Sequence, residues 1–260
     1  MNSPKNTDST AALAAALYAA EREAREIDGI VPAHPDLTLD DAYAIQRALV
    51  ALYERPIVGL KAALTSRAKQ VAMNVTQPGY GTLLDFMKVD GVLRRTELIH
   101  PRVEPEIALF FEDLPTDRVL ASDDIAVLAT GFAPALEVID SRYKKFKFTA
   151  VDVYADNCSS SRFMLGRDVL PLPHPQLELA GVVLEKNGDI VQTGAPAAVL
   201  GHPFTSAAFV LNLAIAHGVQ LPHRFVLLTG GITEAVPVEV DDVIRCRFGG
   251  IGEISLSVTE

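Results

Sequence analysis

The chain has 260 residues, of which 49% are hydrophobic and 22% charged, so it can bury a full core and disorder is not expected. The formal net charge of −10 argues against a nucleic-acid-binding protein, which would need a basic face. The two cysteines, Cys158 and Cys246, form no CxxC pair, which argues against a disulfide scaffold or a cysteine zinc site and predicts a reducing, cytoplasmic compartment.

The first third of the chain predicts a small helical region. Residues 8–27 form an alanine-rich amphipathic helix that lacks the basic start of a secretory signal. No run in the chain approaches the roughly 20 apolar residues of a membrane span. The pattern then predicts a helix over 37–56 that starts with a Thr38–Asp41 capping box, a strand over 57–64, a short helix over 66–75 and a turn over 76–81.

From about residue 85 onward the pattern favours strands. An Asn187-Gly188 pair between two apolar runs is a strong hairpin signal. The sequence therefore predicts an α+β fold, with a small helical N-terminal region over 1–84 and a larger mixed β-sheet domain over 85–260. The elements predicted in this second part are strands near 102–111, 133–140, 179–186, 225–229 and 243–248, and helices over 122–131 and 204–218.

The strand RVEPEIALFF, residues 102–111, carries two carboxylates in an apolar setting. Alternation along a strand places Glu104 and Glu106 on one face, and Glu137 lies in another apolar strand, FAPALEVIDSR. An isolated pair of this kind usually lies on a solvated strand face. Buried carboxylates side by side repel, however, and a divalent cation removes that penalty. Three carboxylates without a nearby thiolate favour Mg²⁺ or Mn²⁺.

Three further features have both a structural and a functional interpretation. Lys61, in VGLKAALTS, is either a lysine extending from a strand edge or a buried ammonium that binds an anionic substrate or moves a proton, with a pKa lowered by burial. The polar stretch over 155–166, ADNCSSSRFMLG, is a turn before a strand or a loop presenting hydroxyls. Thr229-Gly230-Gly231 is a tight turn or a place where backbone approaches a ligand closely.

The sequence gives no support to a nucleotide cofactor or a histidine metal site. It contains no Walker A loop and no strand-turn-helix G-x-G-x-x-G pattern. The six histidines form no pair with metal-ligand spacing.

Taken together, these segments resemble the fumarylacetoacetate hydrolase superfamily, and more closely its branch of 2-oxopent-4-enoate hydratases and 4-oxalocrotonate decarboxylases. The resemblance rests on an ordered set of blocks: GLKAALTSRAKQ, QPGYGTLLDFM, RVEPEIALFF, PALEVIDSR, ADNCSSSRF, GHP and LTGGIT. It implies the mixed β-roll domain of that superfamily, Mg²⁺ bound by Glu104, Glu106 and Glu137, and Lys61 as the active-site lysine. It also implies substrate contacts from Thr65, Gln77, Ser160, Arg162, Thr229 and Gly230.

Two regions distinguish the activities of this branch. Hydratases tend to read QPDFG, with an acid after the proline, whereas this chain has Gly79 there; decarboxylases tend to carry a larger apolar residue, so Gly79 departs from both. SRYKKFKF over 141–148 and SSSRF over 159–163 resemble the decarboxylases. The resemblance therefore implies metal-dependent decarboxylation of 2-oxo-3-hexenedioate to 2-hydroxypenta-2,4-dienoate and CO₂, a carbon–carbon lyase reaction of catechol meta-cleavage. No organic cofactor is expected, because the ketone is the electron sink.

Other roles remain open at this point. The alternatives are a hydratase, an acylpyruvate-type hydrolase and a non-catalytic subunit of a hydratase/decarboxylase complex. The expected partners are a small dicarboxylate substrate and the hydratase of the same pathway, with homo-oligomerisation left open. Arg142 and Arg162 are candidates for binding the distal carboxylate, although a firm salt bridge there would stabilise the ground state and slow CO₂ loss.

Overall fold

The computed structural model describes residues 7–260, apart from the side chains at positions 7, 8, 69 and 72. Its described part contains two sheets and several helices, which confirms the predicted α+β class. No helix in the described part is long and apolar enough to cross a membrane. The helices are α1 (Thr7–Arg22), α2 (Leu39–Leu52), α3 (Arg67–Ala72), α4 (Ser122–Leu128), α5 (Ala150–Ala155) and α6 (Pro203–Ala216).

The larger sheet has seven strands in the order β2-β1-β9-β4-β5-β6, with β10 paired to β4. Its pairings are antiparallel except between β1 and β9, which run parallel. Its strands are β1 (Ile57–Ala63), β2 (Gly79–Leu84), β4 (Arg102–Glu112), β5 (Ala129–Ile139), β6 (Ser160–Leu165), β9 (Arg224–Leu228) and β10 (Val236–Pro237).

The smaller sheet has five strands in the order β3-β12-β11-β7-β8. Asn187 and Gly188 connect β7 to β8 with positive φ angles of 56° and 90°, as the predicted hairpin requires. Its strands are β3 (Val92–Arg94), β7 (Val182–Lys186), β8 (Asp189–Gly194), β11 (Val243–Phe248) and β12 (Gly252–Thr259).

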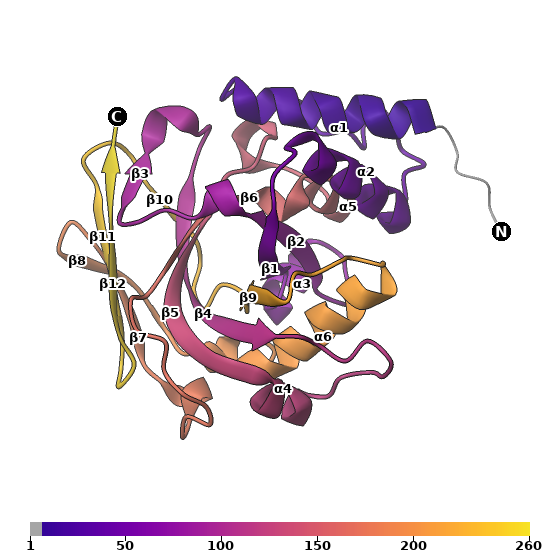
Figure 1. Ribbon diagram of the computed structural model, residues 1–260. Helices are drawn as coiled ribbons and strands as arrows, with labels where there is room; N and C mark the ends of the chain where they lie inside the picture. The colour runs from indigo at the N-terminus through magenta and orange to yellow at the C-terminus, as the bar shows by residue number, and fades with distance from the viewer. Residues whose placement is uncertain (1–6) are drawn as a thin grey trace.

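The long curved strands β4 and β5 run between the helical side of the molecule and the smaller sheet (Figure 1). Helices α1, α2 and α5 lie together at one end, and α4 and α6 lie at the other. β4 is buried on both faces from Val103 to Phe111, apart from Phe110, which is half-buried. Polar side chains on this strand therefore lie deep inside the protein.

Several predicted elements differ from the structure in their bounds. The helix expected over 122–131 ends at Leu128, and residues 129–131 begin β5 instead. The first helix ends at Arg22, because Ala24 turns into the left-handed region at φ 47° and the Arg25 N–H bonds back to the Ala20 carbonyl. The segment expected to be a turn over 76–81 instead enters β2 at Gly79, since this edge strand pairs along the whole of β1. The Thr38–Asp41 capping box is confirmed at the start of α2.

The division at residue 84 stays a prediction of domain organisation. β1 and β2 precede that point, yet they hydrogen-bond into the same sheet as β4, β5 and β9. The pairing of β1 with β9 places Lys61 beside Leu228, one residue before the Thr229-Gly230-Gly231 turn. The sheet thereby brings together three of the segments singled out in the sequence.

Candidate functional site

Three buried glutamates meet where β4 and β5 pair. Glu104 and Glu106 extend from β4, and the register places Glu137 of β5 directly opposite Glu104. Each residue offers one carboxylate oxygen, and these oxygens lie within 4.8 Å of one another. The side chains are at most 4% exposed. Among the described residues, Glu106 Oε1 and Glu137 Oε2 have no hydrogen-bond partner, which is costly for a buried carboxylate.

The cluster gathers three carboxylates beside the Lys61 ammonium. Lys61 Nζ lies 2.9 Å from Glu137 Oε1. Desolvation, reinforced by the charges of Glu137 and Glu104, raises the pKa of Glu106 well above its usual value of 4.5. Desolvation also raises the pKa of Glu137, although Lys61 pulls it down. A divalent cation would relieve the repulsion among the three carboxylates and bind the Glu106 and Glu137 oxygens that have no hydrogen-bond partner among the described residues, so these residues fit Mg²⁺ or Mn²⁺.

Lys61 is a charged ammonium in this environment. Burial alone would lower the pKa of its side chain, but the negative charge of Glu137, with smaller contributions from Cys158, Glu104 and Glu106, raises that pKa above the usual value. The prediction that burial lowers the pKa of Lys61 is therefore wrong for the protein without metal, because the glutamates outweigh desolvation. Lys61 can donate hydrogen bonds to an anion as it stands.

Glycines form the wall around the carboxylates. The Gly230 N–H donates to Glu106 Oε2 at 2.6 Å, and Gly230 has a φ of 114° that side chains rarely adopt. A Cβ on Gly231 would lie 2.0 Å from Glu104 Oε2. The predicted close approach of this backbone is thus to the glutamates themselves. Gly231, which the sequence-based set of site residues lacks, is needed for the position of Glu104.

A cavity of about 250 Å³ opens beside the cluster. Its charged and polar lining residues are buried, and its apolar lining residues are buried or half-buried. The lining residues at the base are Lys61, Thr65, Glu104, Cys158, Ser159 and Gly231, and the apolar ones include Leu64, Met73, Ile139, Phe146, Phe148 and Val153.

Asn157, Cys158 and Ser159 form an unusual turn at this base. All three have positive φ angles, 48°, 55° and 57°, which is strained for residues other than glycine. The Asn157 side chain holds the turn by accepting from the Thr82 N–H at 2.7 Å and donating to the Thr82 carbonyl at 2.9 Å. The Ser159 hydroxyl lines the cavity without a hydrogen-bond partner among the described residues. The sequence predicted a loop presenting hydroxyls over 155–166 but favoured Ser160 over Ser159, because left-handed residues other than glycine leave no composition signal.

The other predicted site residues are placed less directly. Ser160 is buried with a partnerless Oγ among the described residues, yet it does not line the cavity. The Thr229 hydroxyl donates to the Ile107 carbonyl at 3.0 Å, and Gln77 is exposed outside the cavity. Thr65 lines the cavity and contacts Gly230, whose Cβ would lie 2.3 Å from its Oγ1.

The two arginines considered for the distal carboxylate are engaged elsewhere. Arg142 is fully buried and forms an ion pair with Asp156, and its Nη1 lies 3.6 Å from Glu21. Arg162 lies 3.2 Å from Glu97 and does not line the cavity. Their placement gives no support to a contact with the substrate.

Gly79 is packed against two tyrosines. A Cβ at this position would lie 2.3 Å from Tyr154 Cε1 and 2.6 Å from the Tyr43 hydroxyl. Tyr43 stacks on both Tyr154 and Tyr80, with ring centroids 5.2 and 4.9 Å apart. Because the stacked rings occupy the space, an acidic side chain does not fit at position 79.

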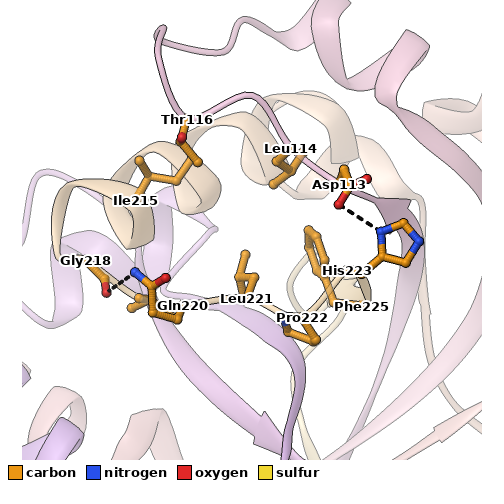
Figure 2. A pocket seen from close by; sticks show the side chains of 11 residues that line it. Asp113, Leu114, Thr116, Ile215, Gly218, Gln220, Leu221, Pro222, His223 and Phe225 are labelled. Carbon is orange, nitrogen blue, oxygen red and sulfur yellow. Dashed lines mark hydrogen bonds and ion pairs between the residues drawn. The ribbon is translucent and has the colours of Figure 1, made fainter.

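A second hollow of about 460 Å³ lies at the C-terminal end of α6 (Figure 2). It contains an ion pair between Asp113 and His223, 2.8 Å apart, and a hydrogen bond from Gln220 to the Gly218 carbonyl. None of the predicted site residues lines it, and its ion pair is largely exposed. The candidate active site is therefore the glutamate cluster rather than this hollow.

No protein-family model matches the chain. A 4-oxalocrotonate decarboxylase from Pseudomonas putida is 40% identical over 260 residues, covering 98% of both chains. A 2-hydroxyhexa-2,4-dienoate hydratase from Comamonas testosteroni is 32% identical, covering 94% of this chain and 95% of its own.

Solved structures give the same relationship. A 4-oxalocrotonate decarboxylase from Pseudomonas putida G7, complexed with magnesium and adipate, superposes with a TM-score of 0.94 at 39% identity, over 99% of this chain and 100% of the other. A protein from Yersinia pestis CO92 assigned to the fumarylacetoacetate hydrolase family superposes with a TM-score of 0.57 at 14% identity, over 79% of this chain and 94% of the other. This second match shows a shared fold alone.

Proposed function

Because the chain belongs to the family of 4-oxalocrotonate decarboxylases and 2-keto-4-pentenoate hydratases, we propose that it decarboxylates 2-oxo-3-hexenedioate to 2-hydroxypenta-2,4-dienoate and CO₂. The observation that carries the proposal is the buried cluster of Glu104, Glu106 and Glu137 beside the Lys61 ammonium, at the base of a cavity. Identity of 40% to a decarboxylase, against 32–34% to the hydratases, favours this reaction within the family.

The three glutamates would hold the metal, with Mg²⁺ as the expected ion and Mn²⁺ as a substitute. Bound there, the ion would supply Lewis-acid stabilisation of negative charge on an oxygen of the substrate. Gly230 fixes the Glu106 carboxylate with its N–H, and Gly231 leaves the space that Glu104 occupies. The ligand positions are thus set by backbone rather than by mobile side chains, which preorganises the site.

The reaction breaks the bond between C5 and C6 of the substrate. The electron pair of that bond moves through C4 and C3 to the C2 oxygen, C6 leaves as CO₂, and protonation of the C2 oxygen gives the dienol. Negative charge therefore grows at the C2 oxygen during the step. Lys61, buried at the base beside Glu137, would stabilise that oxygen by hydrogen bonding, an interaction that strengthens in the transition state. Ser159 offers a second hydroxyl at the same base.

The rival activities have less support. A hydratase of this family tends to use an acid after the proline of the QP motif, and the tyrosines around Gly79 exclude one. A hydrolase would need a Glu–His pair that activates water. The described Glu–His pairs, Glu26–His100 and Glu178–His202, lie outside the cavity lining. Intact metal ligands and lysine argue against a non-catalytic subunit.

The test measures CO₂ release from 2-oxo-3-hexenedioate by the purified chain with Mg²⁺, against a sample treated with EDTA. Metal-dependent CO₂ release with a dienol product supports the proposal. Hydration of 2-hydroxypenta-2,4-dienoate without CO₂ release would instead assign the hydratase reaction. The Glu106→Gln variant, purified in parallel, should release no CO₂ at the same Mg²⁺ concentration.

The product of this reaction is the substrate of a hydratase, so we expect a hydratase of the same pathway as a partner. Co-expression of the two chains followed by size-exclusion chromatography tests this expectation. Co-elution at a stable ratio supports it, and separate elution at working concentrations argues against it.

A further inference from the structure

The cavity has charge at one end and none at the other. Lys61 and Glu104, at the base, are at most 4% exposed, whereas Phe146, Phe148 and Met73 are half-buried. A cavity lined by both sets therefore runs from a charged base to an apolar, more open part. Among the side chains that the structure describes, Lys61 is the single cation in the lining, and it faces Glu137 at 2.9 Å.

Of the cations whose side chains the structure describes near the cavity, the arginines do not line its apolar part. The Arg102 guanidinium lies 4.4 Å from the ring centroid of Phe146 and is not a lining residue. It contacts the ring of Phe146, and Phe146 rather than Arg102 lines the cavity. Arg142 and Arg162 are held by Asp156 and Glu97.

A substrate anchored at the base by its 2-oxo acid end must extend its distal carboxylate toward these apolar side chains. A carboxylate without a counter-ion in an apolar environment is destabilised by lost hydration. Decarboxylation removes that charge from the distal end, since the electron pair of the broken bond ends on the C2 oxygen at the base. The penalty present in the bound substrate is thus relieved in the transition state, which raises kcat rather than affinity.

We propose that Phe146, Phe148 and Val153 form an apolar wall that receives the leaving carboxylate without an ion pair and thereby selects substrates that lose this group. This proposal rests on the proposed function, because the decarboxylation reaction identifies the distal carboxylate as the leaving group. It predicts that a ligand whose distal carboxylate cannot leave binds no more tightly than a ligand without that carboxylate.

The first experiment compares two inert 2-oxo acids by calorimetry in the presence of Mg²⁺. 2-Oxoadipate carries a distal carboxylate that cannot leave, because it lacks the conjugated double bond, and 2-oxohexanoate carries a methyl group there. We expect the wild-type protein to bind 2-oxoadipate no more tightly than 2-oxohexanoate. A preference for 2-oxoadipate of about tenfold or more, which corresponds to about 1.4 kcal/mol, would overturn the proposal because it requires a cation at the distal end.

Variants separate charge from shape. Phe148→Lys should create a preference of about tenfold for 2-oxoadipate and should lower both kcat and KM for 2-oxo-3-hexenedioate. Phe148→Leu, which keeps the wall apolar, should keep the wild-type ratio of affinities whatever its turnover. Val127→Lys adds the same charge on α4, where Val127 is 84% exposed, and should leave the ratio unchanged. A Phe148→Lys variant with raised kcat would contradict the wall.

One further cation is tested directly. Lys69 belongs to α3, between the lining residues Thr65 and Met73, and its side chain lies outside the described part of the structure. Lys69→Met should leave the affinity ratio unchanged, and a shift of the ratio toward 2-oxohexanoate would overturn the proposal. The binding experiment needs no turnover, so it is independent of CO₂ release. CO₂ release together with a clear preference for 2-oxoadipate over 2-oxohexanoate refutes the apolar wall and leaves the proposed decarboxylation intact. No CO₂ release with the expected ratio refutes the proposed decarboxylation, and with it the selective role of the wall.

Discussion

Replacing Glu106 by Gln should stabilise the metal-free protein and abolish its response to Mg²⁺. Glu106 is fully buried among like charges, and its pKa is raised well above 4.5 by desolvation. Gln keeps the shape and an oxygen that can accept from the Gly230 N–H, but it removes one negative charge from the cluster. Since burying a carboxylate among like charges costs several kcal/mol, we expect the free energy of unfolding of the metal-free variant to rise by about 1–3 kcal/mol above pH 7.

The metal response has its own magnitude. An ion that binds the folded state alone at 100 times its dissociation constant adds about 2.7 kcal/mol. In a chain of this size each kcal/mol shifts Tm by roughly 2–4 °C, so saturating Mg²⁺ should raise the wild-type Tm by roughly 5–10 °C. The Glu106→Gln variant should show almost no rise. Thermal unfolding followed by circular dichroism, with and without Mg²⁺ in chelator-treated buffer, measures both quantities.

A control on the same strand isolates the effect. Glu112 lies at the exposed end of β4 and forms an ion pair with Arg224, 2.8 Å apart. Glu112→Gln makes the same chemical change outside the cluster and should keep the wild-type response to Mg²⁺. A Glu106→Gln protein whose Tm rises with Mg²⁺ as much as the wild type would refute the site.

Four further predictions follow from the same contacts. Gly79→Asp should lower the free energy of unfolding by about 1–3 kcal/mol in urea titrations, because its Cβ overlaps Tyr154, and wild-type stability would contradict that packing. Gly231→Ala should displace Glu104 and weaken Mg²⁺ binding about tenfold or more by calorimetry; unchanged affinity would argue against the glycine wall. Lys61→Met should reduce kcat by about 10²-fold or more, whereas activity near the wild-type rate would remove Lys61 from the mechanism. The pKa values of Glu106 and Glu137 are raised in the folded protein, so these groups ionise near pH 4.5 in the unfolded chain and only at higher pH in the folded one. The metal-free protein should therefore lose stability as pH rises above 4.5. The Mg²⁺-induced rise in Tm should grow over the same range, and a pH-independent rise would count against coupled ionisation.

The sequence predicted the pair of glutamates because strand alternation is a local property. Glu104 and Glu106 fall on one face of any strand through 102–111. Their alignment with Glu137 depends on the register between β4 and β5, which includes an irregularity between Phe110 and Phe111. Strand periodicity does not contain that information, so the sequence could name Glu137 as a third carboxylate in an apolar strand but could not place it opposite Glu104.

Other parts of the site depend on contacts between distant segments. The raised pKa of Lys61 follows from how many carboxylates surround it, whereas a single-residue argument counts only burial. The placement of Arg142 follows from its partner Asp156, and the left-handed turn before Ser160 is held by side chains that contact β2. These features follow from tertiary packing, which overrides local preference.

The topology of the larger sheet also sets an order in which the site can assemble during folding. Glu104, Glu106 and Glu137 belong to adjacent antiparallel strands joined through α4, so their contact closes a comparatively short loop. Gly231 reaches them when β9 pairs with β4, and Lys61 reaches them when β1 pairs with β9, which joins Gly59 to Val226 across most of the chain. Closing the longer loop costs more chain entropy, and contacts of this kind form slowly. The metal ligands should therefore gather before the cavity exists, and Mg²⁺ added during refolding should accelerate the early pairing of β4 and β5 while leaving the final closure of β1 onto β9 as the slow step.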